Sequence, residues 1–499
     1  MTTIIKKIMA LFMSFITALV AFGFSFIFPD KSEVLVIPAY PVDQWQGKNL
    51  YINGKLVDIQ IEDGQAVTGP VSPTFRFDKS LSLSVNDNSK TPFNYYGFSL
   101  QSSEPLKGHI TYNILGISQT EEFFIEKSAQ PIEFFSFIDG YFKSLKGYGI
   151  SKISFENLGS EPATIVMNGL ATFNREVLDD TVFISDANYK IGVSLQWGGA
   201  LSYLEYLKAN VQAVRTADDV IIGIDSLTKY GGTLITDKVN LINRADTGRL
   251  VQQSYYGTNG EHDGYIQGTS FNTLWSYNPV QGGNQFGDAS KIVDCRITAD
   301  SIYIKCRPMD WAKHEADITP SYMEATYTLK DGYVKVDCRF VDFSKWESVL
   351  RGQELPAFYA DEPLNSFRYY GGNSPWTGDN QIKQEDHLIF WPDAGMPTFQ
   401  ATEYWCAWTN MEDNGFGIGL YVPGISNMLA GIADRGGKIG DDPSTSGPTS
   451  YVAALKALSI KSFVPLQYNY LVAAGNISDI RQTFTQNRNV IDNTALLNY

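Results

Sequence analysis

Four carboxylates in the second half of the chain lie beside aromatic, glycine or proline residues: Asp246, Glu354, Asp393 and Glu403. A carboxyl group next to Trp or Tyr is partly removed from water, which raises its pKa and suits it to donate a proton. Cleavage of a glycosidic bond needs two carboxyl groups, one protonated and one ionised, across a sugar-sized gap. We predict that catalytic carboxylates come from this set, although each one also suits a turn or a structural ion pair.

The stretch 246–284 combines an arginine, several amides and aromatic side chains with frequent glycines. Glycine lets the backbone approach another group closely, while amides and Arg offer planar hydrogen bonding. A sugar ring presents hydroxyls to such polar groups and C–H faces to aromatic rings. We therefore predict sugar contacts for these residues of the stretch: Arg249, Gln252, Gln253, Tyr255, Tyr256, Asn278 and Gln281.

A second aromatic stretch, 367–377, holds two Tyr, a Gly-Gly pair, a Pro and a Trp, which cannot all be strand core. We predict that sugars stack there and on the tryptophans next to two of the acids. The residues are Tyr369, Tyr370, Trp376, Trp391 and Trp405. His314 could donate a proton to a substrate or be an ordinary loop residue.

No pattern in the sequence indicates a metal or a cofactor. Glu261-His262-Asp263 could supply a general base or a metal ligand, but it also fits a polar hairpin tip. Serine-hydrolase, P-loop, dinucleotide and EF-hand motifs are absent. None of the four cysteines shows CxxC spacing, so we expect free core thiols, with one disulfide left open for an exported chain.

Composition identifies a folded globular protein and restricts its partners. Hydrophobic residues make up 43% and charged residues 19% of the 499 residues. The net charge of -15 disfavours nucleic-acid binding, which needs a basic patch. It also disfavours anionic polysaccharides, unless a local basic pocket overrides the overall sign.

The N-terminus carries an export or anchoring signal. Lys6-Lys7 precede an apolar run over residues 8–28, which is long enough to span a bilayer and is followed by no clear cleavage site. We expect residues 1–31 to be a cleaved signal peptide or a retained membrane anchor. Either outcome makes the protein secreted or attached to the cell surface.

Residues 32–183 are predicted to form an accessory β-sandwich. Short strands, such as Leu56–Ile61 and Leu81–Val85, alternate with turn signals about every ten residues. No catalytic set of residues appears there. The domain could be a spacer, a carbohydrate-binding module or a sheet that docks onto the rest of the chain.

Residues 184–499 are predicted to be almost entirely β. In Tyr333–Val341, apolar and charged residues alternate with period two, as in a half-buried antiparallel strand. Helical periodicity is hard to find, and Ile480–Arg488 is the best short candidate.

The order of motifs in this region resembles galactose mutarotase-like domains. The motifs are Gly198-Gly-Ala-Leu-Ser-Tyr-Leu204, Val239-Asn-Leu-Ile-Asn243 and Asp246-Thr-Gly-Arg-Leu-Val-Gln-Gln253, and the resemblance extends over about 185–480. It implies an all-β chain with a large antiparallel supersandwich that binds carbohydrate. Aldose epimerases use two histidines and a glutamate, and the four histidines here do not fit those positions, so simple mutarotase activity is not expected.

Three functions remain open. The first is a glycoside hydrolase that acts on a neutral oligo- or polysaccharide outside the cell. The second is a non-catalytic glycan-binding surface protein, and the third is a polysaccharide lyase that uses Tyr, His and Arg. Paired acids within about 5–10 Å across a cleft would favour hydrolysis.

Overall fold

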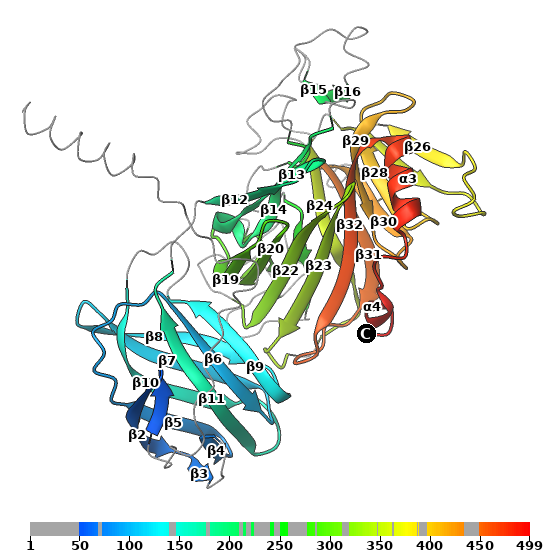
Figure 1. Ribbon diagram of the computed structural model, residues 1–499. Coiled ribbons are helices and arrows are strands. Elements are labelled where there is room, and N and C mark those ends of the chain that lie inside the picture. The colour runs from blue at the N-terminus through cyan, green and yellow to red at the C-terminus, as the bar shows by residue number, and fades with distance from the viewer. Residues whose placement is uncertain are drawn as a thin grey trace, which may run out of the picture. The chain divides into compact units, whose positions relative to one another are not determined.

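The computed structural model describes residues 49–499, apart from 68–71, 139–145, 176–179, 209–212, 216–220, 224–239, 244–249, 258–276, 285–286, 312–318, 347, 362–363, 387, 389–396 and 434–448. The described residues belong to one compact unit. They are almost entirely β, as predicted (Figure 1). No helix within them is both long and apolar enough to cross a membrane, and the apolar run over 8–28 lies outside them.

The N-terminal strands form the predicted β-sandwich. Its strands are β1 (Asn49–Ile52), β2 (Lys55–Asp63), β3 (Gln65–Val67), β4 (Thr74–Phe77), β5 (Ser80–Val85), β6 (Tyr95–Ser102), β7 (Leu106–Ile114), β8 (Ile117–Ile125), β9 (Ser128–Phe137), β10 (Tyr148–Asn157) and β11 (Ala163–Phe173). One layer pairs β4, β11, β6 and β9, and the other pairs β2, β5, β10, β7 and β8. The β1–β2 hairpin connects the two layers.

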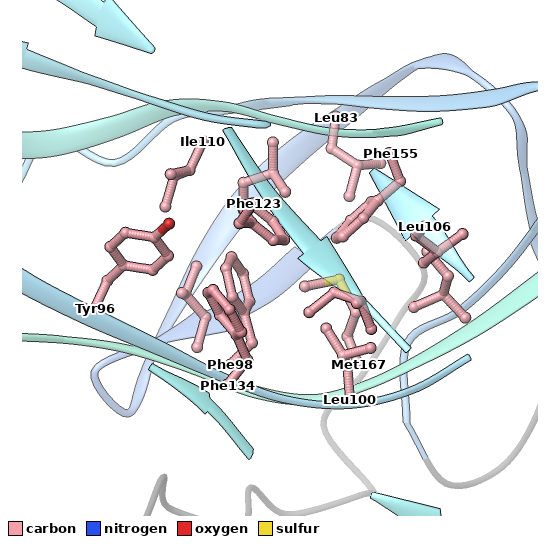
Figure 2. Close-up of a cluster of buried hydrophobic side chains, with 14 of the residues drawn as sticks. Leu83, Tyr96, Phe98, Leu100, Leu106, Ile110, Phe123, Phe134, Phe155 and Met167 are labelled. Atoms are coloured by element: carbon pink, nitrogen blue, oxygen red, sulfur yellow. The ribbon is translucent and has the colours of Figure 1, made fainter. Parts of the chain in front are cut away.

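Aromatic and aliphatic side chains fill the space between the two layers. Figure 2 shows Phe123 and Phe155 pointing from one layer toward Phe98 and Phe134 of the other. The alternation that buries every second residue of β5 and β7 explains why these strands form a sandwich. Each fully buried side chain of this size contributes about 1.5–3 kcal/mol to stability.

The remaining strands form two large antiparallel sheets. The seven-stranded sheet has the order β21 (Met309–Asp310), β18 (Pro279–Val280), β17 (Gln252–Ser254), β24 (Arg351–Asp361), β31 (Thr449–Leu458), β30 (Asn427–Ala433) and β27 (Thr398–Gln400). The nine-stranded sheet has the order β19 (Lys291–Ile297), β20 (Ser301–Arg307), β22 (Ser321–Lys330), β23 (Tyr333–Asp342), β32 (Leu466–Asn476), β29 (Phe416–Tyr421), β28 (Trp405–Thr409), β25 (Ser366–Tyr370) and β26 (Ile382–Asp386). Tyr255 after β17 meets Phe340 of β23 at 4.7 Å between ring centroids, so the sheets pack face to face.

Smaller elements complete this part of the chain. Strands β12 (Thr181–Ser185), β13 (Tyr189–Ser194) and β14 (Ala200–Tyr206) form a three-stranded sheet, and β15 (Ala213–Arg215) pairs with β16 (Ile221–Gly223). A short 3-10 turn, η2 (Leu195–Trp197), precedes Gly198 and Gly199, both with positive φ. A Cβ on Gly198 would lie 1.8 Å from the carbonyl oxygen of Gln281, so the predicted glycine pair permits a close backbone approach.

The predicted C-terminal helix is α3 (Ile477–Asn487), and α4 (Thr494–Leu497) follows it. Ile477, Ile480 and Phe484 recur at helical spacing and are buried. They pack with Trp405 and Tyr421 of the nine-stranded sheet. This face of the sheet is therefore covered by the chain's own C-terminal segment.

The sandwich docks onto the nine-stranded sheet through an aromatic and charged surface. Asp294 of β19 accepts a hydrogen bond from the Tyr95 hydroxyl at 2.7 Å and forms an ion pair with Arg175 at 3.3 Å. The guanidinium of Arg296 lies 4.9 Å from the ring centroid of Phe135. Tyr95 and Phe135 are consequently buried. These contacts join the sandwich to the nine-stranded sheet, and which of the three roles the domain has stays a prediction. The predicted boundary at 183/184 stays a prediction; it falls within β12, whereas the last sandwich strand, β11, ends at Phe173.

Three ion pairs extend this docking surface along β8 and the residue that follows it. Glu122 accepts a hydrogen bond from Arg307 at 2.9 Å, and Glu121 pairs with Lys291. Glu126, just beyond β8, pairs with Arg339 at 2.5 Å. Nearby cations lower the pKa of Glu122, although its burial acts in the opposite direction. The interface therefore combines charge with aromatic packing.

Candidate functional site

Glu354 lies on β24, the middle strand of the seven-stranded sheet, within a cluster of hydroxyl groups. The phenol of Tyr256 donates a hydrogen bond to Glu354 Oε1 at 2.9 Å, and the phenol of Tyr451 donates to the same oxygen at 2.5 Å. Ser254 is the cross-strand partner of Glu354, and its hydroxyl lowers the pKa of this carboxyl. We call Glu354, Ser254, Tyr256 and Tyr451 the Glu354 cluster.

Local backbone geometry places these side chains together. Three neighbouring strands supply them, since β24 pairs with β17 on one side and with β31 on the other. The register of β24 against β31 shifts between Glu354 and Ala357. Pro356 lies in this irregularity, where its missing N–H removes no ladder hydrogen bond. Bulges of this kind redirect side chains, often next to active sites.

Burial governs the electrostatics of the Glu354 cluster. Glu354 is partly buried, and its Oε1 accepts from the phenols of Tyr256 and Tyr451. Burial raises the pKa of Glu354, and hydrogen bonds from Tyr451, Tyr256 and Ser254 offset part of that rise. Burial also raises the pKa of the Tyr256 and Tyr451 phenols well above their usual values, so they remain neutral donors.

The side chains packed around the cluster are apolar and aromatic. Tyr359 and Tyr451 are cross-strand partners whose ring centroids lie 4.7 Å apart. Leu429 and Leu455 pack beside them. A carboxyl with a raised pKa on such a face can exchange a proton with a bound ligand.

Glu403, a second predicted acid, occupies a different environment. It is fully buried, and Arg481 of α3 donates to both of its oxygens at 2.7 and 3.0 Å. The Trp405 indole and the Trp376 backbone N–H also donate to it, each at 2.7 Å. We call Glu403, Arg481, Trp376 and Trp405 the Glu403 cluster. Its contacts give Glu403 a structural role that ties α3 to the nine-stranded sheet, and we leave it out of the proposed catalytic residues.

Five of the predicted sugar contacts in 246–284 are instead buried structural residues: Gln252, Gln253, Tyr255, Asn278 and Gln281. Gln253 donates to the Glu324 carbonyl at 2.8 Å, and Asn278 donates to the Tyr255 carbonyl at 2.7 Å. Gln252 accepts from the Gly282 backbone at 2.8 Å, and Gln281 accepts from the Gln253 backbone at 3.2 Å. Their amides satisfy irregular backbone between the sheets, so they are not available to a sugar.

The second aromatic stretch is also mostly packed. Tyr370 and Trp405 are fully buried in the cluster under α3, which corrects their prediction as stacking residues. Trp376 is partly exposed but packs edge-on against Tyr421 at 5.9 Å and below Arg488. Tyr369 is partly exposed beside Phe399, so a stacking role for it stays a prediction.

The other predicted site residues lie outside the described residues: Asp246, Arg249, His314, Trp391 and Asp393, together with Glu261-His262-Asp263. Of the four predicted acids, the structure therefore describes Glu354 and Glu403, and it places them in separate clusters on different sheets. Within the described ranges, no group of three His, Cys, Asp or Glu residues could hold a metal ion. The four cysteines are buried and free, as expected.

Tyr451 and Ser254 are the site residues that the sequence did not reveal. Tyr451 lies 97 residues from Glu354 along the chain, in a strand of small and aliphatic residues. Nothing in its local sequence distinguishes it from a core tyrosine. Only the pairing of β24 with β31 reveals its contact with Glu354.

Comparison with known proteins gives distant likenesses. No family model and no curated protein matches the chain. Among solved structures, a provisionally named aldose 1-epimerase of Escherichia coli K12 is 9% identical, with a TM-score of 0.32, and covers 60% of this chain and 99% of its own. A galactose mutarotase related enzyme of Lactobacillus acidophilus is also 9% identical, with a TM-score of 0.32, covering 59% and 97%. A family 29 carbohydrate-binding module solved with cellulohexaose is 10% identical, with a TM-score of 0.19, covering 27% and 87%.

Two of these likenesses are to proteins named as an aldose 1-epimerase and a galactose mutarotase related enzyme, the kind of protein that the motif order suggested. This resemblance is distant at these identities and TM-scores. The functional case rests on the side chains of the Glu354 cluster.

Proposed function

We propose that the protein is carbohydrate-active and that its reaction is glycoside hydrolysis, with Glu354 as the proton-transferring carboxyl. One observation carries this proposal. Glu354 combines a raised pKa with two phenol donors on the face of the seven-stranded sheet. A carboxyl that stays protonated above its usual range is what a general acid requires.

The chemistry of the same face favours a neutral sugar. Phenols and a serine hydroxyl can exchange hydrogen bonds with sugar hydroxyls, and the ring of Tyr256, which is partly exposed, can pack on C–H groups. No Lys, Arg or His is among the described groups that shift the pKa of Glu354. None of these described groups is a cation that would offset the charge of an anionic sugar.

Hydrolysis requires a second carboxylate across the sugar. Glu403 is occupied in its own cluster, so the proposal assigns this role to Asp246 or Asp393, on the sequence argument alone. The proposal places the reaction outside the cell, because Lys6-Lys7 and the apolar run over 8–28 form an export or anchoring signal.

Binding without cleavage is the second candidate. It is favoured by the single carboxyl in the Glu354 cluster, since a binding face needs no paired acids. A lyase is the third outcome, because tyrosines beside a carboxyl could serve as its proton-transfer groups.

A product-release assay separates these functions. The purified full-length chain is incubated with plant, bacterial and host glycans, and new reducing ends and ultraviolet absorbance of unsaturated sugars are recorded. Reducing ends without absorbance support hydrolysis, and Glu354→Gln should then lose at least about 100-fold in rate. Glu62→Gln, on the exposed face of the sandwich, is the matched control and should retain the rate.

The other outcomes are equally defined. Unsaturated products would replace the hydrolase with a lyase. Retention on one glycan with no product would make the protein a binding protein. An E354Q variant with unchanged rate would remove Glu354 from the mechanism.

A further inference from the structure

The two phenols of the Glu354 cluster share one acceptor atom. Both Tyr256 and Tyr451 donate to Oε1 of Glu354, at 2.9 and 2.5 Å. A carboxylate oxygen has about two lone-pair sites, and two donors occupy them. A proton on Oε1 would displace one of the phenols, so the protonated acid carries its proton on Oε2 if both bonds persist.

We propose that Tyr256 and Tyr451 are positioning residues that hold Oε1 of Glu354 as an acceptor and confine proton transfer to Oε2. This inference rests on the proposed function and deepens it. The phenols bind Oε1, and the proton is transferred from Oε2, so the phenols act on the reaction through Glu354. They determine which oxygen of Glu354 faces the substrate and how readily that oxygen gives up its proton.

The proposal gives the phenols a defined part in the reaction. Oε2–H transfers its proton to the glycosidic oxygen, which also takes the electron pair of the breaking C–O bond. Water adds to the anomeric carbon and gives its proton to the second carboxylate. As Glu354 becomes negative, the hydrogen bonds at Oε1 strengthen and stabilise the charge that forms.

After burial, the hydrogen bonds from these two phenols are the largest effects on the pKa of Glu354, and substitution can remove them. Ser254 lies on the β17 side and Tyr451 on the β31 side, and the ring of Tyr359 of β24 packs against the Tyr451 ring. Lys456 of β31 is paired with Gln353, one residue away, and is not among the groups that shift the pKa of Glu354. Burial opposes ionisation, and the hydroxyl donors favour it.

The test measures the protonation of Glu354 directly in the full-length chain. The carbonyl stretching band of protonated Glu354 is identified by its loss in Glu354→Gln and titrated by infrared difference spectroscopy. Tyr256→Phe and Tyr451→Phe should each raise the midpoint by about one pH unit, since each removes a hydrogen bond to the ionised form. The double variant should raise it further.

Tyr359→Phe is the matched control, because it removes a phenol from the same sheet face that is not among the groups shifting the pKa of Glu354. Its midpoint should equal that of the wild type. Unchanged midpoints in both Tyr256→Phe and Tyr451→Phe would overturn the proposal. If Tyr451→Phe does not fold, Tyr256→Phe decides alone.

Activity separates this inference from the proposed function. If the wild type cleaves a glycan, the alkaline limb of the kcat profile should move up in both variants by the same amount as the infrared midpoint. A merely structural role would lower kcat at every pH without moving that limb. Shifted midpoints in a chain that cleaves no glycan would retain the positioning role and reject the hydrolase.

Discussion

Removal of the Arg481 side chain tests the structural role assigned to the Glu403 cluster. In Arg481→Leu, Glu403 stays fully buried and loses both of its contacts with the guanidinium. The hydrogen bond of Arg481 to the Asp379 carbonyl, at 2.5 Å, and its position over the Tyr370 ring, at 4.8 Å, are lost as well. A buried carboxylate left without its cation typically costs about 3–5 kcal/mol.

Urea unfolding, followed by tryptophan fluorescence, measures this cost. Hydrogen exchange of the α3 amides should report it locally, because Arg481 ties the helix to the sheet. The matched control is Lys152→Leu, whose partner Glu62 and own side chain are 42% and 45% exposed. That exposed pair should contribute little to stability, because water and salt screen it.

A second variant separates lost charge from lost packing. Adding Glu403→Gln to Arg481→Leu removes the stranded charge and keeps an acceptor for the Trp405 indole. The double variant should therefore be more stable than Arg481→Leu alone. A loss below about 1 kcal/mol in Arg481→Leu, or simple additivity in the double variant, would refute this reasoning.

Three further predictions follow from the described contacts. Burial raises the native pKa of Glu354 above its unfolded value, so the wild type loses stability as pH rises through the native pKa. In urea titrations, the unfolding free energy of Glu354→Gln should equal that of the wild type at about pH 4 and exceed it at about pH 8. Gly198→Ala should destabilise the chain severely, because the new Cβ would lie 1.8 Å from the Gln281 carbonyl oxygen. Gly332→Ala, whose Cβ would have nothing within 4 Å, should lower the unfolding free energy measured by thermal unfolding by only about 1–2 kcal/mol. Burial raises the pKa of all four thiols, that of Cys295 to about 12, so a thiol reagent should label none in the native chain and four in denaturant; rapid native labelling would contradict their burial.

Strong periodicity made several elements predictable from the sequence. The alternation in Tyr333–Val341 identified β23 and its buried face, on which Val334, Val336, Cys338 and Phe340 lie. The helical spacing near the C-terminus identified α3. These patterns result from contact with one apolar face, which the local sequence records.

The candidate site was harder to predict, because its residues look like core residues. Gln253 and Asn278 are the amides expected of a sugar site, yet they bond to backbone between the sheets. A sequence does not distinguish an amide that binds a ligand from one that satisfies a buried carbonyl. Glu354 was one of the four predicted acids, and its role stays a prediction; its contact with Tyr451 depends on strand pairing between residues 97 positions apart.

The docking surface of the N-terminal sandwich has a consequence for synthesis of the chain. The backbone of Phe124 bonds to the Tyr322 hydroxyl, 198 residues later in the sequence. At about 5–20 residues per second, a ribosome needs roughly 10–40 s to make that interval. During this time the sandwich can fold, but Tyr95, Phe135 and Phe124 have no cover. The nascent chain therefore presents an aromatic surface early, and a chaperone has a defined interval in which to protect it.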